Sequence, residues 1–415
     1  MDLFNIISVL ISMSALFSYV NYRYFKLPRT IGLMLCAMVL SLGLIVAGHF
    51  GWEVRQPAAD IVAKLDFNRL LLQGMLGFLL FAGALHVEAN ELLTHKWMIF
   101  TLSTAGVIIS TALVGLAAWF IFDLMSLSVP FIYCLLFGAL ISPTDPVAVL
   151  GILKDLGAPK SIETQMAGEA LFNDGIGVVV FVVILGVIEG GQAAPWREAV
   201  LIFAKEAVGG VALGLLLGWL AYLMLKRVDN YQVEVLITLG LVMGGYELAH
   251  ALNTSGPLAI VAAGLLIGNQ GRALAMSETT RRNLDTFWEL IDEILNALLF
   301  VLIGIEALLL DIRLEYILAG LALIPAVLLV RLLSVGLPFS LMERRMPFRN
   351  QTVKILTWGG LRGGIAMALA LSFPHGPYRA VILFGTYMIV VFSIVVQGLT
   401  IRRLCSKWVP EQTGG

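Results

Sequence analysis

The sequence predicts an all-α polytopic membrane protein, and three properties support that fold class. The chain has 415 residues, of which 59% are hydrophobic and only 13% are charged. Soluble domains carry roughly 25% charged residues, so this composition excludes an ordinary soluble protein. Mean hydropathy is +0.91. Apolar stretches of about 20 residues, the length that spans a bilayer as a helix, recur along the whole chain.

In chain order, these stretches predict about thirteen transmembrane helices, of which the ninth is short. The segment 52–66 is amphipathic, and we expect it to lie at the membrane interface. No polar stretch is long enough for a soluble regulatory domain, so 1–415 is predicted to form one transmembrane unit. The expected spans are 3–24, 30–49, 67–87, 98–124, 127–153, 161–188, 197–225, 233–252, 256–270, 286–310, 314–342, 350–373 and 379–403.

Basic residues in the loops predict the orientation. Most of the 27 Lys and Arg residues lie in alternate loops, for example Arg23, Lys154 and Arg344, and the opposite loops carry few. Cytoplasmic loops are the ones enriched in Lys and Arg. We therefore expect a multi-pass protein of the cell (inner) membrane with its N-terminus outside and its C-terminus in the cytoplasm. The first residues lack the basic segment of a cleaved signal peptide, so the first apolar run is expected to be a retained helix.

Composition and motifs also argue against several function classes. The net charge is −1 and no basic tail is present, so no nucleic-acid partner is expected. The sequence contains no HExxH, Walker A or GxSxG motif, so neither an enzyme nor a cofactor is predicted. Cys36, Cys134 and Cys405 are scattered, which favours small apolar fillers over metal ligands or disulfides.

Two of the expected helices look broken. In 127–153, Pro143 and Pro146 remove backbone donors, so the helix should unwind between them. Breaks at membrane depth survive where they line a cavity or are buried in protein. Paired breaks are typical of transporters built from inverted repeats, although two ordinary kinks are the alternative. The second break is expected in 350–373, where Arg362 is surrounded by Gly359, Gly360, Gly363 and Gly364.

Asp145 and Asp174 are the candidate ion-binding carboxylates. An ionised carboxylate in hydrocarbon costs on the order of several kcal/mol, so it is rarely kept there without binding a cation or a proton. Asp174 lies mid-helix and can hold one monovalent cation or one proton, so competition for it would couple two fluxes. Thr144 and the unwound carbonyls near Asp145 offer further oxygen ligands, and the amide of Asn173 can orient its neighbours. Alternatively, Asp145 only neutralises the start of the second half-helix.

Glu169 also lies inside an apolar span and needs a partner. Because Arg stays charged and pairs bidentately with carboxylates, we expect a structural ion pair between Glu169 and Arg362. A proton relay through Glu169 is the alternative. Arg331 is a second arginine in mid-segment, and the sequence does not choose its partner among Asp292, Glu293 and Glu306.

Three sequence runs carry a resemblance to a known family. They are SPTDPVAV at 142–149, GEALFNDG at 168–175 and WGGLRGGI at 358–365. In this order they closely resemble the NhaP-type sodium/proton antiporters, bacterial relatives of the eukaryotic sodium/proton exchangers within the monovalent cation/proton antiporter superfamily. The resemblance extends over the whole chain. It implies an NhaA-like fold of inverted repeats with two crossing discontinuous helices, a homodimer, and elevator-like movement of a core domain.

The resemblance also implies roles for individual residues. Asp174 corresponds to the ion-binding carboxylate, and Asn173 to the first residue of an Asn-Asp pair that accompanies electroneutral 1:1 exchange. Thr144 and the backbone around Asp145 correspond to further ligands of Na⁺ or Li⁺. Glu169 and Arg362 correspond to the core ion pair. The chain departs from the family at two positions that often carry oxygen ligands, because it has Ala82 and Ala170 there.

Together these features predict a secondary antiporter that exchanges Na⁺ or Li⁺ for H⁺. Potassium/proton exchange is the alternative within transport, and a gated cation channel is a less favoured one. The expected ion-translocation core covers about 67–188 and part of 286–403. The expected dimerisation or scaffold helices cover about 1–49 and 197–270.

Overall fold

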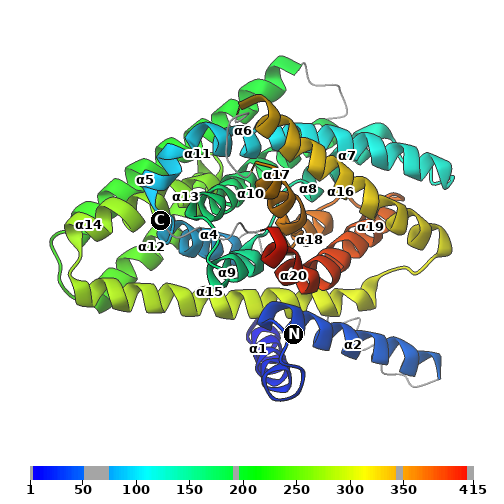
Figure 1. Cartoon of the computed structure of the whole chain (residues 1–415), viewed down its shortest axis with the longest axis horizontal. Coiled ribbons are helices and arrows are strands. Elements are labelled where there is room, and N and C mark those ends of the chain that lie inside the picture. The colour runs from blue at the N-terminus through cyan, green and yellow to red at the C-terminus, as the bar shows by residue number, and fades with distance from the viewer. Residues whose placement is uncertain (1–2, 51–73, 190–195, 343–348, 409–415) are drawn as a thin grey trace.

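A computed structural model of the chain describes residues 3–50, 74–189, 196–342 and 349–408. Within these ranges every regular element is a helix, which confirms the predicted all-α class (Figure 1). The amphipathic segment predicted at 52–66 lies outside the described residues, as does the first part of the span predicted at 67–87.

One group of helices packs around α15, which crosses the molecule along one edge (Figure 1). Helix α2 packs along α15, α4 packs against α13 and α15, and α13 packs against α11 and α12. The group consists of α1 (Leu3–Val20), π-helical η1 (Asn21–Phe25), α2 (Arg29–His49), α4 (Leu76–Leu85), α11 (Trp196–Leu225), α12 (Tyr231–Ala251), α13 (Gly256–Leu266), π-helical η3 (Ile267–Gly271), α14 (Arg272–Ala275), α15 (Glu278–Glu306) and 3-10 helical η4 (Ala307–Leu309).

A second group packs around α8, α10 and α16. Helix α7 packs against α8 and α16, α10 packs against α6 and α8, and α16 packs against α19. The group consists of α6 (Lys96–Ser103), α7 (Ala105–Leu124), α8 (Phe131–Ile141), α9 (Val147–Asp155), α10 (Lys160–Glu189), α16 (Leu314–Met342), α17 (Arg349–Gly359), α18 (Gly364–Leu371), α19 (Arg379–Phe392), π-helical η5 (Ser393–Gln397) and α20 (Gly398–Trp408). The short α5 (Ala89–Thr94) lies between α4 and α6 in the chain.

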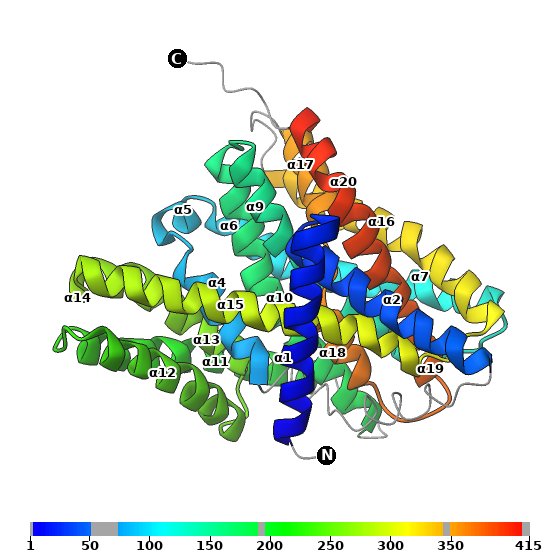
Figure 2. The ribbon, with the colours of Figure 1, turned by 90° about the horizontal axis from the view of Figure 1, so that it is seen from below.

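Helix α15 begins about two turns before the predicted span at 286–310. Ser277 caps its start, because the Ser277 hydroxyl accepts a hydrogen bond from the backbone N–H of Thr280 at 3.4 Å. The charged residues of the first turns therefore belong to the helix and not to a loop. Figure 2 shows α15 running across the molecule, with α1 crossing it and α2 alongside. The indole of Trp288 ties α15 to α12 by donating to the Thr238 hydroxyl at 3.1 Å.

Both predicted helix breaks are present. Helix α8 ends at Ile141 and α9 begins at Val147, while α17 ends at Gly359 and α18 begins at Gly364. The two non-helical stretches touch, because the backbone N–H of Asp145 donates to the carbonyl of Leu361 at 2.8 Å. The two broken helices thus meet at their breaks.

Length and composition identify fewer spans than the sequence predicts. Seven helices in the described ranges are long and apolar enough to cross a membrane, and three apolar helices are shorter. The predicted count of about thirteen is therefore not established by this criterion. Each half of a broken helix is too short to meet the length criterion, and α15 begins with charged turns that do not meet the composition criterion.

The contact between α7 and α8 has no room for a side chain at Gly138. A Cβ added there would overlap the backbone carbonyl of Thr111, and backbone cannot move aside as a flexible side chain can. We predict that Gly138→Ala destabilises the protein by about 1–3 kcal/mol, measured as a lower unfolding temperature in detergent. Gly240→Ala is the control, because nothing lies within 4 Å of a Cβ at Gly240. Equal unfolding temperatures for the two variants would contradict this packing.

Candidate functional site

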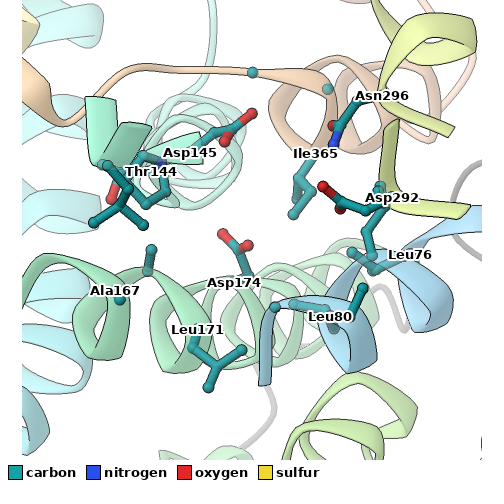
Figure 3. A pocket seen from close by; sticks show the side chains of 18 of the residues that line it. Leu76, Leu80, Thr144, Asp145, Ala167, Leu171, Asp174, Asp292, Asn296 and Ile365 are labelled. Atoms are coloured by element: carbon teal, nitrogen blue, oxygen red, sulfur yellow. The ribbon is translucent and has the colours of Figure 1, made fainter. Parts of the chain in front are cut away.

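A cavity of about 480 Å³ lies where the two groups of helices face each other. Its walls come from α4, α10 and α15 and from the two helix breaks. Figure 3 shows the carboxylates of Asp145, Asp174 and Asp292 around the same space, each from a different element. Asn296, one turn after Asp292 on α15, also lines it. The structure thus brings the two predicted carboxylates together and adds a third.

Asp174 lies near the middle of the 30-residue helix α10 and faces the cavity. Among the described residues its carboxylate has no hydrogen-bond or ion-pair partner. Its neighbour Asn173 is buried and is held against the first break. The Asn173 amide donates to the Thr144 hydroxyl at 2.8 Å and accepts from the Thr144 backbone N–H at 3.4 Å. Asn173 therefore fixes Thr144 relative to α10.

Asp145 lies inside the first break and faces the second. Its carboxylate lies so close to Gly363 that a Cβ there would come within 2.6 Å of Asp145 Oδ2. Thr144 and Asp145 both line the cavity beside Asp174. The hydroxyl of Thr144 and the carboxylates of Asp145 and Asp174 thus form a set of hard oxygen donors at one place in the cavity.

Arg362 lies in the second break, is only 3% exposed, and holds the end of α8. Its Nη1 donates to the carbonyls of Ser142 at 2.5 Å and Pro143 at 2.7 Å. Its backbone N–H donates to the hydroxyl of Ser393 at 2.8 Å. The last carbonyls of a helix carry partial negative charge and lack partners within it. Arg362 supplies both the hydrogen bonds and the positive charge that these carbonyls need.

The structure corrects the predicted Glu169–Arg362 ion pair, because Glu169 pairs with Arg331 of α16. The contact is bidentate: Arg331 Nη1 donates to Glu169 Oε1, and Nη2 donates to Oε2 at 3.0 Å. Arg331 also donates to the carbonyl of Leu356 near the end of α17, from Nε at 3.3 Å and from Nη2 at 3.2 Å. The sequence left the partner of Arg331 open among three acidic residues, and none of those is the partner observed.

Two positions without oxygen ligands lie on the cavity wall. Ala82 of α4 and Ala170 of α10 both face the cavity, as do Leu76, Leu80 and Leu171. This side of Asp174 is therefore apolar. The carboxylate of Asp292 faces the same cavity from α15. From the sequence, Asp292 is expected only as one of three possible partners for Arg331. Its spacing from Trp288 and Asn296, one turn on each side, was the available signal that all three share a face.

The Glu169–Arg331 pair is expected to stabilise the protein strongly. Removing one partner of a buried ion pair leaves an uncompensated charge and costs about 3–5 kcal/mol. We predict that Glu169→Gln and Arg331→Gln each lower the free energy of unfolding strongly. The double variant should lose less than the sum of the two single losses, with a coupling energy above about 1 kcal/mol. The measurement is a double-mutant cycle on unfolding in detergent.

The matching cycle between Glu169 and Arg362 is the control. Arg362 donates to backbone carbonyls and does not share the bidentate contact, so its coupling to Glu169 should be smaller. A larger coupling of Glu169 to Arg362 than to Arg331 would contradict the observed pairing.

Comparisons with known proteins place the chain in a family. The family model described as "Sodium/hydrogen exchanger, transmembrane" matches residues 11–407. The Na(+)/H(+) antiporter NhaP of Pseudomonas aeruginosa is 50% identical over 409 residues, covering 97% of this chain and 96% of that protein. The Na(+)/H(+) antiporter NhaH of Halobacillus dabanensis is 33% identical over 392 residues, covering 93% of each.

A solved structure supports the fold independently. The structure of the sodium proton antiporter MjNhaP1 from Methanocaldococcus jannaschii at pH 8 matches with a TM-score of 0.77 and covers 99% of this chain and 100% of that one. At 20% identity this likeness concerns the fold alone. The identity to the curated relatives and the extent of the family match are what decide membership. The chain therefore belongs to the sodium/hydrogen exchanger family of transmembrane proteins.

Proposed function

We propose that the chain is a secondary antiporter that exchanges Na⁺ for H⁺ at Asp174. The observation that carries the proposal is the position of the Asp174 carboxylate, which faces a cavity at the meeting point of two broken helices. Broken helices at membrane depth are the usual setting of cation sites in transporters. The relatives named as Na(+)/H(+) antiporters support Na⁺ as the cation. They give no corresponding support to K⁺.

In the proposed site, Na⁺ binds Asp174 together with the hydroxyl of Thr144, and Asp145 contributes oxygen from the first break. Li⁺ has the same preference for oxygen and is proposed as a second substrate. Asn173 holds Thr144 in place through its two hydrogen bonds. Glu169 is proposed as structural, because both of its oxygens accept from Arg331. Binding of a proton to Asp174 removes the negative charge that a cation needs, so the two ions compete.

The packing supports a division into two bodies that differs from the one expected from the sequence. We propose an ion-translocation core of about 96–189 and 314–408 and a scaffold of about 3–49, 76–85 and 196–306. Helices α4 and α15 then belong to the scaffold, because they pack mainly against α13, α2 and each other. Movement of the core against this scaffold would give elevator-like alternating access.

Further features are proposed on the same basis. A single carboxylate next to Asn173 supports electroneutral 1:1 exchange. Counting both halves of each broken helix as one span supports about thirteen spans in inverted repeats, as in an NhaA-like fold.

In Figure 2, α1 begins and α20 ends at opposite ends of the molecule, which supports an outside N-terminus and a cytoplasmic C-terminus. We also propose a homodimer in the cell (inner) membrane, formed through the scaffold.

Replacing Asp174 tests the proposed exchange directly. In proteoliposomes with an imposed proton gradient, added Na⁺ or Li⁺ should dequench an internal pH dye, and Asp174→Asn should abolish this response because an amide cannot exchange a proton for a cation. Asp123→Asn is the control, since Asp123 is exposed on α7. A response unchanged in Asp174→Asn would refute the site. A stronger response to K⁺ than to Na⁺ would refute the sodium assignment, and cation flow that cannot be driven uphill would indicate a channel.

Competition predicts a pH dependence with a defined sign. As pH falls, protons occupy Asp174 and the apparent KM for Na⁺ should rise, by up to about ten-fold per pH unit once the carboxyl is mostly protonated. The maximal rate at saturating Na⁺ should change less than the KM. The measurement is the initial rate against Na⁺ concentration at several pH values. A KM that stays constant while the maximal rate falls would contradict competition at one site.

A further inference from the structure

Asp292 is a carboxylate of the cavity that the proposed exchange at Asp174 does not use. It lies on α15, between Trp288 one turn before it and Asn296 one turn after it, and all three line the cavity. Figure 3 shows Asp292 facing the space into which Asp174 also points. Figure 3 shows the Asn296 amide next to the Asp292 carboxylate on this wall.

The charged groups around Asp292 do not neutralise it. Its acidic neighbours are Asp145, Glu289 and Glu293, and among the described residues it has no ion pair. The basic groups nearby have other partners: Arg331 binds Glu169, Arg362 binds two carbonyls of the first break, and Arg29 binds Glu293. His86, at the end of α4, is the remaining titratable group on the wall, and its Nδ1 lies 2.9 Å from the carbonyl of Ala82. The wall thus has an excess of negative charge.

The cavity has further lining residues besides the three aspartates. They include Glu289 on α15, His86 after α4, and Leu150. Leu150 lies in α9, which ends at Asp155 just before the start of α10 at Lys160, and this end of the molecule is the proposed cytoplasmic side. Helix α4 packs beside α15, and its lining residues Leu76 and Leu80 are apolar. Among the described residues of the scaffold, the carboxylates that line the cavity are therefore those of Asp292 and Glu289 on α15.

We propose that Asp292 is a cation-docking residue on the scaffold that concentrates Na⁺ next to Asp174 and sets the affinity for Na⁺ on one side of the membrane. Negative charge lining a cleft with low-dielectric walls raises the local concentration of a cation. Asp292 belongs to α15 and Asp174 to α10, so movement of the core separates the two. Docking therefore acts only while the cavity is open to the proposed cytoplasmic side. The inference rests on the proposed exchange at Asp174.

Kinetics measured separately from each side of the membrane test this. In everted membrane vesicles, Asp292→Asn should raise the KM for Na⁺ by about five-fold, the order expected for loss of one charge in a partly screened cavity, with the maximal rate retained. In right-side-out vesicles its KM should match that of the wild type. Asp292→Glu keeps the charge and should restore much of the affinity. Glu293→Gln is the matched control, because Glu293 is the next residue and pairs with Arg29, with both side chains about half exposed.

Each other result overturns the inference. An unchanged KM for Na⁺, or an equal shift of the KM on both sides of the membrane, would show that Asp292 is not a docking residue on the scaffold. A loss of maximal rate with unchanged KM would indicate a purely structural role. If the wild type shows no exchange, the proposed function fails, and docking is then tested by Na⁺-dependent thermal stabilisation of the purified protein. Half-maximal stabilisation should need several-fold more Na⁺ in Asp292→Asn, and equal Na⁺ requirements would refute docking.

Discussion

The structure depends on satisfying the helix ends that two broken helices leave inside the protein. Carbonyl groups at such ends carry partial negative charge and cannot reach water in an apolar interior. Two buried arginines meet this need. Arg362 donates to Ser142 and Pro143 at the end of α8, and Arg331 donates to Leu356 near the end of α17. Each arginine belongs to a different segment from the helix end that it holds, so these contacts also fix the broken segments relative to their neighbours.

The ion pair of Arg331 distinguishes the acidic residues of α10 from each other. Glu169 lies on α10, as does Asp174, but its two oxygens are occupied by Arg331. A bidentate, buried pair of this kind holds its geometry, because separating it would leave charges unpaired in a medium of low dielectric. Asp174 has no such partner among the described residues and faces the cavity instead. Two acidic residues of one helix thus have different surroundings, because only Glu169 pairs with an arginine among the described residues.

The sequence predicted those features that arise from local chemistry. Pro143, Pro146 and the glycines around Arg362 predicted both breaks. The position of Asp174 in mid-helix predicted an ion-binding role, which stays a prediction. The arginine pairing was not predictable, because Glu169 and Arg331 are 162 residues apart and only the packing of α10 against its neighbours brings them together. The charged residues in the first turns of α15 predicted a loop, but in the structure they are helical, and Ser277 caps the start of the helix. The spacing of Asp292 from Trp288 and Asn296 predicts only that the three share a face, and the packing of α15 decides that this face lines the cavity.

The two groups of helices contribute different kinds of groups to the cavity. The broken segments and α10 supply Thr144, Asp145 and Asp174, whose positions are fixed by Asn173 and by contacts between the breaks. Helix α15 supplies Asp292 from the other side, while α4 supplies mainly apolar side chains. A site whose ligands all lie on one rigid body can be carried as a unit, because movement of that body does not change the distances between them. A group on the facing body can act on the ion only during part of the cycle. This asymmetry follows from where the residues lie, and it separates the residues that we propose to bind the ion in transit from the one that we propose to control its entry.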